Sequence, residues 1–161
     1  MSGATGLSAS ARKVQEALAA LGFEHEIIEL DQPVRSAAAA AAAVGCAVGQ
    51  IAKSIVFRGA ESGRAVLVIT SGANRVNEQR IGELLGEPLE KAGPDFVRER
   101  TGFAIGGVPP VGHATALETF VDEDLLAHTE IWAAAGHPNA LFRLAPQDLA
   151  RMAGGRVVGV K

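Results

Sequence analysis

The stretch Ile51–Thr70, IAKSIVFRGAESGRAVLVIT, decides the fold that this sequence predicts. Ile51–Arg58 and Ala65–Thr70 are both rich in β-branched residues, which favour strands. Gly59–Arg64 lies between them and has the composition of a tight turn. We therefore expect the two segments to pair as antiparallel neighbours in a sheet.

Lys53 has an unusual place in the first of these strands. Alternate residues of a strand share a face. One face is then predicted to carry Ile51, Lys53, Ile55 and Phe57, and the other Ala52, Ser54, Val56 and Arg58. A lysine in the middle of the more apolar face either extends its amine to an opening or lines the floor of a pocket. In both cases it is a good partner for an ester carbonyl or a phosphate.

The rest of the chain predicts a mixed α/β domain. Cap residues and apolar periodicity indicate helices at 9–21, 37–44, 77–85, 94–101 and 146–153. Strands are expected at 24–30, 88–91, 115–121, 130–133, 140–144 and 157–160. The order is rich in hairpins and lacks the regular strand–helix alternation of a doubly wound sheet. We predict a mostly antiparallel sheet or partial barrel with surrounding helices.

Size and charge limit the function. The chain has 161 residues, enough for a single domain over 1–161. Its net charge of −3 argues against a general nucleic-acid binder, and no DNA partner is expected. A local basic strip that meets RNA briefly stays open. The candidates for it are Arg58, Arg64, Arg75 and Arg80.

Metal, disulfide and membrane classes receive no support. Cys46 is the single cysteine, which excludes an internal disulfide framework and a cysteine-based zinc site. The acidic run Asp122–Asp124 has no spaced partner and is expected to be solvated surface. No apolar run approaches the ~18 residues of a membrane span. We expect a soluble cytoplasmic protein without metal, cofactor or membrane partner.

The loop Thr101–His113, TGFAIGGVPPVGH, is the second informative stretch. Gly106 and Gly107 allow sharp bends and close approach of a ligand, whereas Pro109 and Pro110 fix the backbone that follows. The pattern fits a rigid crossover, and it equally fits a shaped loop that offers the amides of residues 106–108. Neither the dinucleotide fingerprint nor the phosphate loop has this spacing.

The familiar catalytic signatures are absent, because the sequence has neither a GxSxG nor an HExxH motif. His137 stands on a stiff turn between Gly136 and Pro138, where a histidine is structural or functional. What remains is a lysine on an apolar strand, a glycine loop and this turn. Amides preorganised toward an oxyanion suit ester cleavage, so an ester hydrolase is the chemistry that these residues favour.

The motifs IAKSIVF, TGFAIGGVPPVGH and the GHPN turn, in this order, resemble the YbaK family of aminoacyl-tRNA editing domains. That family is related to the editing insertion domain of bacterial prolyl-tRNA synthetase, and the likeness extends over nearly the whole chain. The resemblance implies the YbaK/prolyl-tRNA synthetase-associated domain fold. It also implies hydrolysis of amino acids wrongly attached to tRNA, commonly tRNA for proline, without a metal, in the service of translation fidelity.

The resemblance also implies roles for particular residues. Lys53, Gly106 and Gly107 match the family's functional lysine and its G-x-x-x-P loop, and are expected to be catalytic. The expected substrate-binding residues are Ser54, Val108, Pro109, Pro110, His113, Gly136 and His137. Ser54 stands where some members have asparagine, and this neighbour of the lysine helps to line the pocket.

The implied mechanism has no protein nucleophile. Lys53 would orient the terminal phosphate or ester, and the Gly106–Val108 amides would hold the carbonyl or α-amino end. Water, the tRNA 2′-hydroxyl or a substrate side chain would attack. Alanine, cysteine, serine and threonine are the expected cargo. Since the acidic pI implies weak affinity for tRNA, prolyl-tRNA synthetase or an elongation factor could deliver the substrate.

Two other classes of function stay open. One is a non-catalytic module that binds aminoacyl-tRNA or a synthetase. The other is a hydrolase of small acyl esters on the same fold, because a fold does not fix a function.

Overall fold

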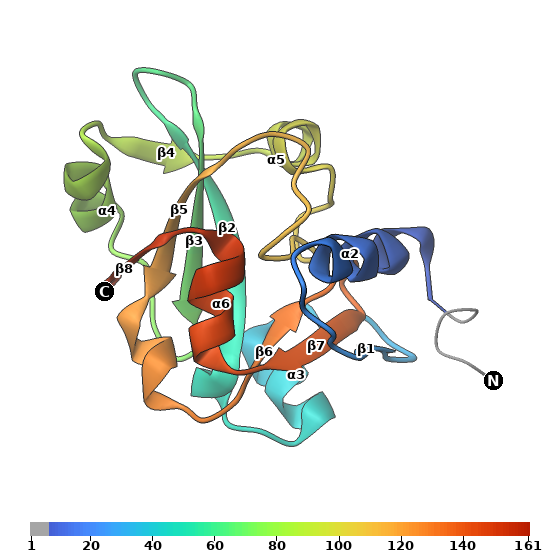
Figure 1. Ribbon diagram of the computed structural model, residues 1–161. Coiled ribbons are helices and arrows are strands. Elements are labelled where there is room, and N and C mark those ends of the chain that lie inside the picture. Colours follow the sequence, from blue (N-terminus) through green and yellow to red (C-terminus); the bar gives the residue numbers. More distant parts are fainter. Residues whose placement is uncertain (1–6) are drawn as a thin grey trace.

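The computed structural model describes residues 7–161, which form one eight-stranded sheet with helices on both faces (Figure 1). The strands are β1 (Ile27–Glu29), β2 (Ile51–Gly59), β3 (Ala65–Ser71), β4 (Leu89–Lys91), β5 (Glu118–Asp122), β6 (Ile131–Ala134), β7 (Ala140–Leu144) and β8 (Arg156–Val158). The helices are α2 (Ala9–Ala20), α3 (Ala37–Val44), α4 (Glu78–Leu85), α5 (Pro94–Thr101) and α6 (Pro146–Ala153), with 3₁₀ turns η1 (Val48–Gln50) and η2 (Glu123–Ala127). The mixed α/β class predicted from the sequence is confirmed.

The β2–β3 hairpin is the long central pair of the sheet, as the sequence predicts. Its antiparallel register joins Ala52 to Ser71 at one end and Arg58 to Ala65 at the other. Lys53 lies directly across from Thr70. The full strand order is β1-β7-β6-β2-β3-β5-β8, with β4 paired to β2.

The sheet contains more parallel pairing than the sequence predicts. β2 pairs with β6, β3 with β5 and β5 with β8 in parallel, whereas the remaining pairs are antiparallel. Parallel neighbours need a long crossover. The connection from β3 to β5 provides one, because α4, β4, α5 and a long loop all lie within it. The ordered path of strands ends at β1 and β8, so the sheet is open.

Helix ends follow the cap residues of the sequence. The side chains of Ser8, Ser36 and Asn77 each accept a hydrogen bond from a first-turn amide. Gly45, Gly86, Gly102 and Gly154 end their helices in the left-handed region that favours glycine. These local signals explain why the predicted helix bounds agree closely with the structure.

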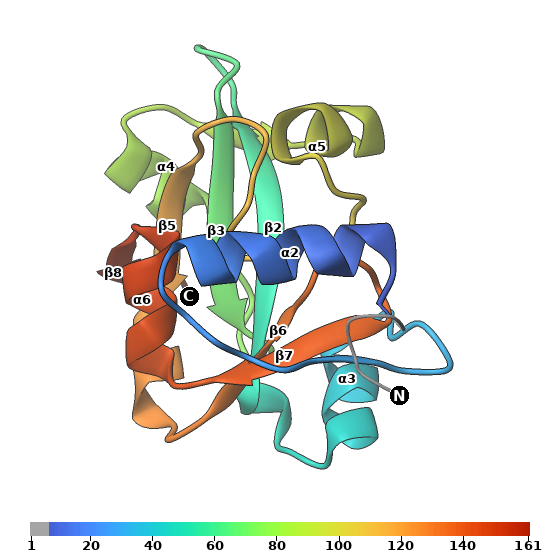
Figure 2. The same ribbon diagram turned by 45° about the vertical axis from the view of Figure 1, so that its right-hand side comes forward.

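The core has a large layer on one face of the sheet and two smaller clusters on the other. The large layer joins α2, α6 and the loop after α5 to the inward residues of β2 and β3, including Ala52, Val56, Leu67 and Ile69. On the opposite face, Ile81 of α4 packs on Phe57, Val66 and Val68, and α3 packs on Ile51. Figure 2 shows α2 lying across the front of β2 and β3.

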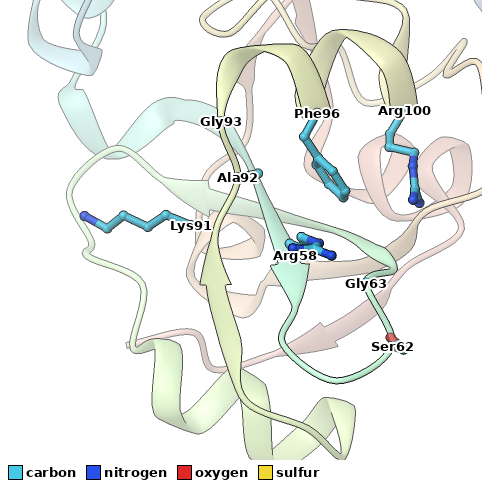
Figure 3. A pocket seen from close by; sticks show the side chains of 8 residues that line it. All are labelled: Arg58, Ser62, Gly63, Lys91, Ala92, Gly93, Phe96 and Arg100. Atoms are coloured by element: carbon cyan, nitrogen blue, oxygen red, sulfur yellow. The ribbon is translucent and has the colours of Figure 1, made fainter.

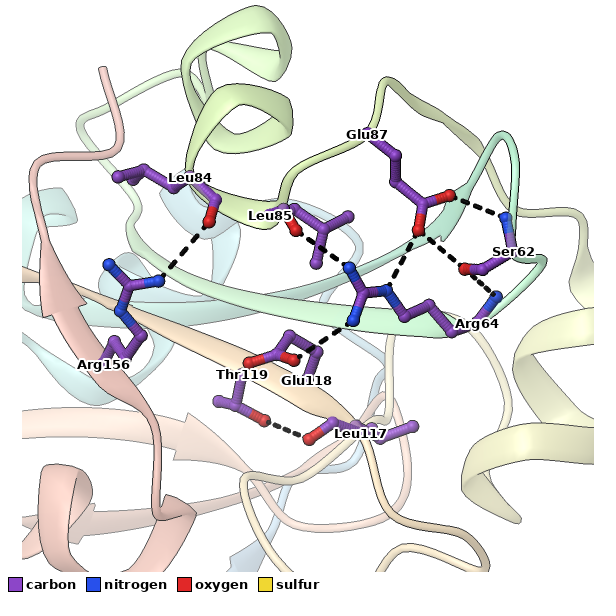
Figure 4. A network of polar contacts seen from close by, with 9 residues as sticks. All are labelled: Ser62, Arg64, Leu84, Leu85, Glu87, Leu117, Glu118, Thr119 and Arg156. Carbon is purple, nitrogen blue, oxygen red and sulfur yellow. Dashed lines mark hydrogen bonds and ion pairs between the residues drawn. The ribbon is translucent and has the colours of Figure 1, made fainter.

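A buried carboxylate fixes the tip of the hairpin (Figure 4). Glu87 accepts hydrogen bonds from the amides of Glu61 and Ser62, both at 2.8 Å, and from the Ser62 hydroxyl at 2.7 Å. Arg64 donates to the same carboxylate at 3.1 Å and also lies 3.6 Å from Glu118. The turn is therefore tied to the segment after α4.

Across residues 7–161, none of the helices has the length and apolar character needed to cross a bilayer.

Candidate active site

A break in the strand pairing marks the middle of β2. On the side away from β3, β6 pairs with Ile51 and Ala52, and β4 pairs with β2 only from Phe57 onward. The edge from Lys53 to Val56 thus has no strand ladder. Hydrogen bonds from the Gly72 amide to Ile51 and from the Gly59 amide to Arg64 show that odd-numbered residues of β2 bond to β3. The main-chain groups of Ser54 and Val56 therefore point toward the open edge.

Lys53 and Ser54 project from opposite faces of this edge. Lys53 is exposed and lies between the two small clusters that contain Ile51 and Phe57, on the face of Thr70. Its amine has no hydrogen bond or ion pair with any of residues 7–161. Lys53 thus extends its amine away from an apolar face, one of the two outcomes expected from the sequence.

Ser54 faces the large core layer, since its neighbours Ala52 and Val56 both belong to it. The Ser54 hydroxyl oxygen is shielded from solvent and lacks a hydrogen-bond partner within the described residues. A buried unpaired hydroxyl costs free energy, about 1–3 kcal/mol, and is rare in folded proteins. Beside the open strand edge, this hydroxyl is a hydrogen-bonding group that a water or a ligand would satisfy.

The glycine–proline loop packs on the same layer as Ser54. Val108 and Val111 are 3% and 4% exposed, and Pro109 and Pro110 are buried with them. Gly106 is exposed and has a φ of 90°. The buried residues from Gly107 to Val111 anchor the loop, and Ile105 and Gly106 stay exposed.

Of the three loop amides that the sequence predicts to be available, at residues 106–108, one is already hydrogen-bonded within the loop. The Gly107 amide donates to the Ala104 carbonyl at 3.0 Å, so the prediction that it is on offer is wrong. The bend at Gly106 closes a short turn that captures this amide, an effect of local geometry that the residue types did not reveal. The amides of Gly106 and Val108 have no partner within residues 7–161.

The loop meets the Gly-His-Pro turn backbone to backbone. A methyl group on Gly107 would lie 2.8 Å from the His137 amide nitrogen and 3.0 Å from the Gly136 carbonyl carbon. A methyl group on Gly106 would lie 3.8 Å from the Pro138 side chain. The structure thus joins Gly106, Gly107, Gly136 and His137, which are about thirty residues apart in sequence. We call this contact the loop–turn junction.

Hydrogen bonds from a third segment hold the turn. Asn139 and Leu30 exchange two hydrogen bonds, at 2.7 and 3.0 Å, and the Val34 amide donates to the Pro138 carbonyl. His137 itself is exposed, and its Nδ1 accepts from the Asn139 amide at 3.4 Å. With Nδ1 accepting, the neutral ring carries its hydrogen on Nε2.

His113 closes the far end of the loop. Its Nε2 lies 2.6 Å from the Pro109 carbonyl oxygen, which can only accept, so Nε2 carries the hydrogen. Burial lowers the pKa of His113, and this hydrogen bond partly opposes the shift. His113 was predicted to bind substrate. In the structure its ring holds the proline half of the loop.

Helix α2 contributes contacts that the sequence did not reveal. A methyl group on Gly136 would lie 2.6 Å from the Ser10 carbonyl oxygen, and one on Gly112 would lie 3.1 Å from Ala17. The Lys13 amine sits over the Phe103 ring at 4.7 Å, beside Gly102. The spacing of residues 10, 13, 14 and 17 marks one helix face, but nothing in the sequence says what that face covers.

No group of three or more His, Cys, Asp or Glu side chains comes together anywhere in residues 7–161, so this part of the chain presents no ready ligand set for a metal. The junction is instead a site of main-chain groups. Ser54, at the open edge of β2, faces the same core layer as the loop, whereas Lys53 projects from the opposite face of the sheet.

The fold defines the class of protein. The structure superposes with a TM-score of 0.91 on that of a candidate trans-editing enzyme for prolyl-tRNA synthetase, at 52% identity, covering 96% of this chain and 98% of the other. The family profile described as aminoacyl-tRNA editing domain matches residues 31–152. The chain therefore belongs to the aminoacyl-tRNA editing domain family, as the resemblance indicated.

Two relatives extend the comparison. The uncharacterised protein YwhH of Bacillus subtilis is 28% identical over 134 residues, which cover 83% of this chain and 85% of YwhH. The proline–tRNA ligase of Bacillus licheniformis is 35% identical over 99 residues, 60% of this chain but 17% of the ligase. The similarity to the ligase is thus confined to a small part of that enzyme.

Proposed function

We propose that the chain is a trans-editing hydrolase that removes a small amino acid from mischarged tRNA, most readily tRNA for proline. The family and the structural relative support editing. The loop–turn junction is the observation that carries the proposal at this site, because it brings exposed Gly106, whose amide has no partner within residues 7–161, next to the turn that carries exposed His137. A protein of this activity is expected to work in the cytoplasm.

The proposed reaction needs no protein nucleophile. The oxygen of water, or of a hydroxyl on the substrate, attacks the ester carbonyl carbon. The bond from that carbon to the ribose 3′-oxygen breaks, and the ribose oxygen takes up the proton. With water as the attacking group, the products are the free amino acid and tRNA with a 3′-hydroxyl.

Main-chain donors would stabilise the negative charge that develops on the carbonyl oxygen. Each such donor contributes about 10²–10³-fold in comparable acyl transfers. The Gly106 and Val108 amides, which have no partner within residues 7–161, would take this role, and Gly107 would support them by packing on the Gly136–His137 backbone. Pro109, Pro110 and His113 keep the loop in shape.

The open edge of β2 would receive the 3′ end of the tRNA. The unpaired main chain at Ser54 and its hydroxyl can hydrogen-bond to the substrate, and the Lys53 amine on the other face can meet a phosphate. Small side chains are the expected cargo because Val108 and the two prolines are already packed tightly.

A deacylation panel tests the proposal. Transcripts of tRNA for proline would be charged with alanine, serine, cysteine, threonine or proline and incubated with wild type, Lys53→Ala, Ser54→Ala and the control Lys161→Ala. We expect wild type and the control to hydrolyse one of the mischarged species. Lys53→Ala should lose about 10- to 100-fold in kcat/KM, because a hydrogen bond between charged groups contributes about 1.5–3 kcal/mol.

Ser54→Ala has a separate expected result. Because the hydroxyl has no partner, its removal should leave the melting temperature unchanged or raised. Deacylation should still fall if the hydroxyl contacts the substrate. Hydrolysis of none of the charged tRNAs by excess wild type would refute the proposal. Equal hydrolysis of free amino-acid esters would favour a small-molecule esterase instead.

A further inference from the structure

A second concave site lies away from the loop–turn junction. A hollow of about 390 Å³ opens between the β2–β3 turn, the end of β4 and the start of α5 (Figure 3). Its lining consists of Arg58, Ser62, Gly63, Lys91, Ala92, Gly93, Phe96 and Arg100. None of the residues assigned above to the editing site belongs to it, and among residues 7–161 no carboxylate is part of its lining.

Two arginines meet at one aromatic ring in this hollow. The guanidinium carbons of Arg58 and Arg100 lie 5.9 and 4.8 Å from the centre of the Phe96 ring. Figure 3 shows these side chains directed into the same space, whereas the Lys91 side chain extends away from it. Two like charges at one ring repel each other, and an anion between them would relieve the repulsion.

The arginines have only exposed acidic partners. Arg58 pairs with Glu90 at 2.9 Å, with both side chains nearly half exposed. Arg100 is 3.8 Å from Glu99, which is 79% exposed. Exposed pairs of this kind contribute little free energy, so both guanidinium groups can exchange their partner for a phosphate at small cost.

Local contacts of the surrounding chain fix the shape of the hollow. Gly63 has a φ of 74°, and a methyl group there would lie 3.3 Å from the Arg58 guanidinium. Ser62 is held by Glu87 through two hydrogen bonds. Gly93 is the N-cap residue of α5, so the positive end of that helix dipole also faces the site.

We propose that this hollow binds the sugar–phosphate backbone of the tRNA substrate, and this inference rests on the proposed function. The net charge of −3 gives the whole molecule no attraction for RNA, so affinity must come from a local cluster. The basic strip expected from the sequence needs correction here. Arg64 is engaged by Glu87 and Glu118, and the structure sets Arg100 beside Arg58 instead.

Helix α5 connects the hollow to the editing site. Its eight residues span about 12 Å. Arg100 accepts hydrogen bonds at its carbonyl from the Thr115 hydroxyl and amide, at 2.7 and 3.1 Å, which fixes it to the end of the loop. In the proposed complex, one RNA strand would place its ester at the loop and a phosphate at the arginines.

The test compares wild type with Arg58→Gln/Arg100→Gln. The matched control is Arg143→Gln, because Arg143 also pairs with an exposed glutamate, Glu130 at 3.6 Å, and lies 6.0 Å from the ring of Trp132. Binding of uncharged tRNA transcript would be measured over a range of salt concentrations. Thermal melts would verify that all three proteins are folded.

We expect the double variant to bind tRNA about tenfold more weakly and its log–log salt slope to fall by about one to two. In deacylation assays its KM should rise with kcat unchanged. Its hydrolysis of an aminoacyl ester of adenosine, which has no RNA backbone to reach the hollow, should equal that of wild type. The control should behave as wild type throughout.

Several results would overturn the RNA-binding inference. They can be told apart from results that would overturn the proposed deacylase activity. Wild-type affinity and salt slope in the double variant would refute the RNA site while editing stands. Absence of salt-dependent tRNA binding by wild type would refute it as well, and so would equal competition by a polyglutamate peptide of the same charge. Arginine-dependent binding of tRNA without any deacylation would support the hollow and refute editing.

Discussion

Gly136 carries two constraints at once. Its φ of 93° disfavours any side chain, and a methyl group would lie 2.6 Å from the Ser10 carbonyl oxygen, which belongs to rigid helix backbone. Gly22 has a similar φ of 85°, but nothing lies within 4 Å of the added carbon. The pair separates backbone strain from crowding.

We predict that Gly136→Ala lowers the free energy of unfolding by about 3 kcal/mol, from strain and crowding together. Gly22→Ala should cost about 1 kcal/mol, from strain alone. Urea unfolding measures both. Equal losses of unfolding free energy for the two variants would show that α2 moves aside at little cost, so that crowding at Gly136 adds nothing.

His113 predicts a pH dependence of stability. Burial holds its pKa below the ordinary value, so the unfolded chain binds the proton more readily than the folded one. The stability that comes from the neutral ring is complete above the unfolded pKa of about 6.5 and is lost as the pH falls through the lower folded value.

We expect His113→Gln to reduce the loss of stability on acidification, because glutamine can donate to the Pro109 carbonyl without titrating. Urea midpoints of wild type and variant, followed from neutral to mildly acidic pH, measure this. Parallel curves for the two proteins would contradict the assignment.

Single residues also show where sequence interpretation ends. Strand alternation correctly separates Lys53 from Ser54, because that pattern is local to β2. The capture of the Gly107 amide by Ala104 depends on a turn geometry that glycine permits but does not require. Residue type alone therefore predicts where the backbone can bend. It does not predict which amide becomes hydrogen-bonded in the resulting turn.

At the scale of elements, Glu87 joins the β2–β3 turn to the end of α4. Hydrogen bonds from the backbone and side chain of Ser62, with the charge of Arg64, lower its pKa to about 2. The stability from this carboxylate is present above the ordinary value of 4.5 and is lost as the pH falls toward about 2.

Glu87→Gln should lower the melting temperature at neutral pH, because an amide offers one acceptor oxygen to four donors and turns its NH₂ toward Ser62 or Arg64. The same variant should lose part of the pH dependence between 4.5 and about 2. Glu130→Gln, at an exposed pair, is the control. An unchanged melting temperature for Glu87→Gln would mean that the β2–β3 turn does not depend on its hydrogen bonds to Glu87.

Element bounds were predictable for a physical reason. The Ser36 cap and the Gly45 stop of α3 act within a few residues of the helix, so the sequence determines them directly. The parallel pairing of β3 with β5 depends on how the long segment 72–117 crosses the sheet. No local pattern encodes that path, so the sequence predicted a mostly antiparallel sheet without indicating which pairs are parallel.

At the scale of the molecule, the candidate site is made of segments distant in sequence. The motifs at Lys53, Gly106 and His137 each indicate a shaped backbone, but only the fold brings the last two into contact. Family resemblance anticipated that association, because relatives share the fold. Local sequence patterns predicted only the conformation of each of the three segments by itself.

The contact of α2 with Gly136 has a consequence for how such domains diverge. The family profile begins at residue 31, after α2 (Ala9–Ala20), whereas the structural relative at 52% identity covers 96% of this chain. Helix α2 backs the turn through Ser10 and Val14. A substitution on that face of α2 would therefore move the turn while every residue of the Gly-His-Pro motif stays the same.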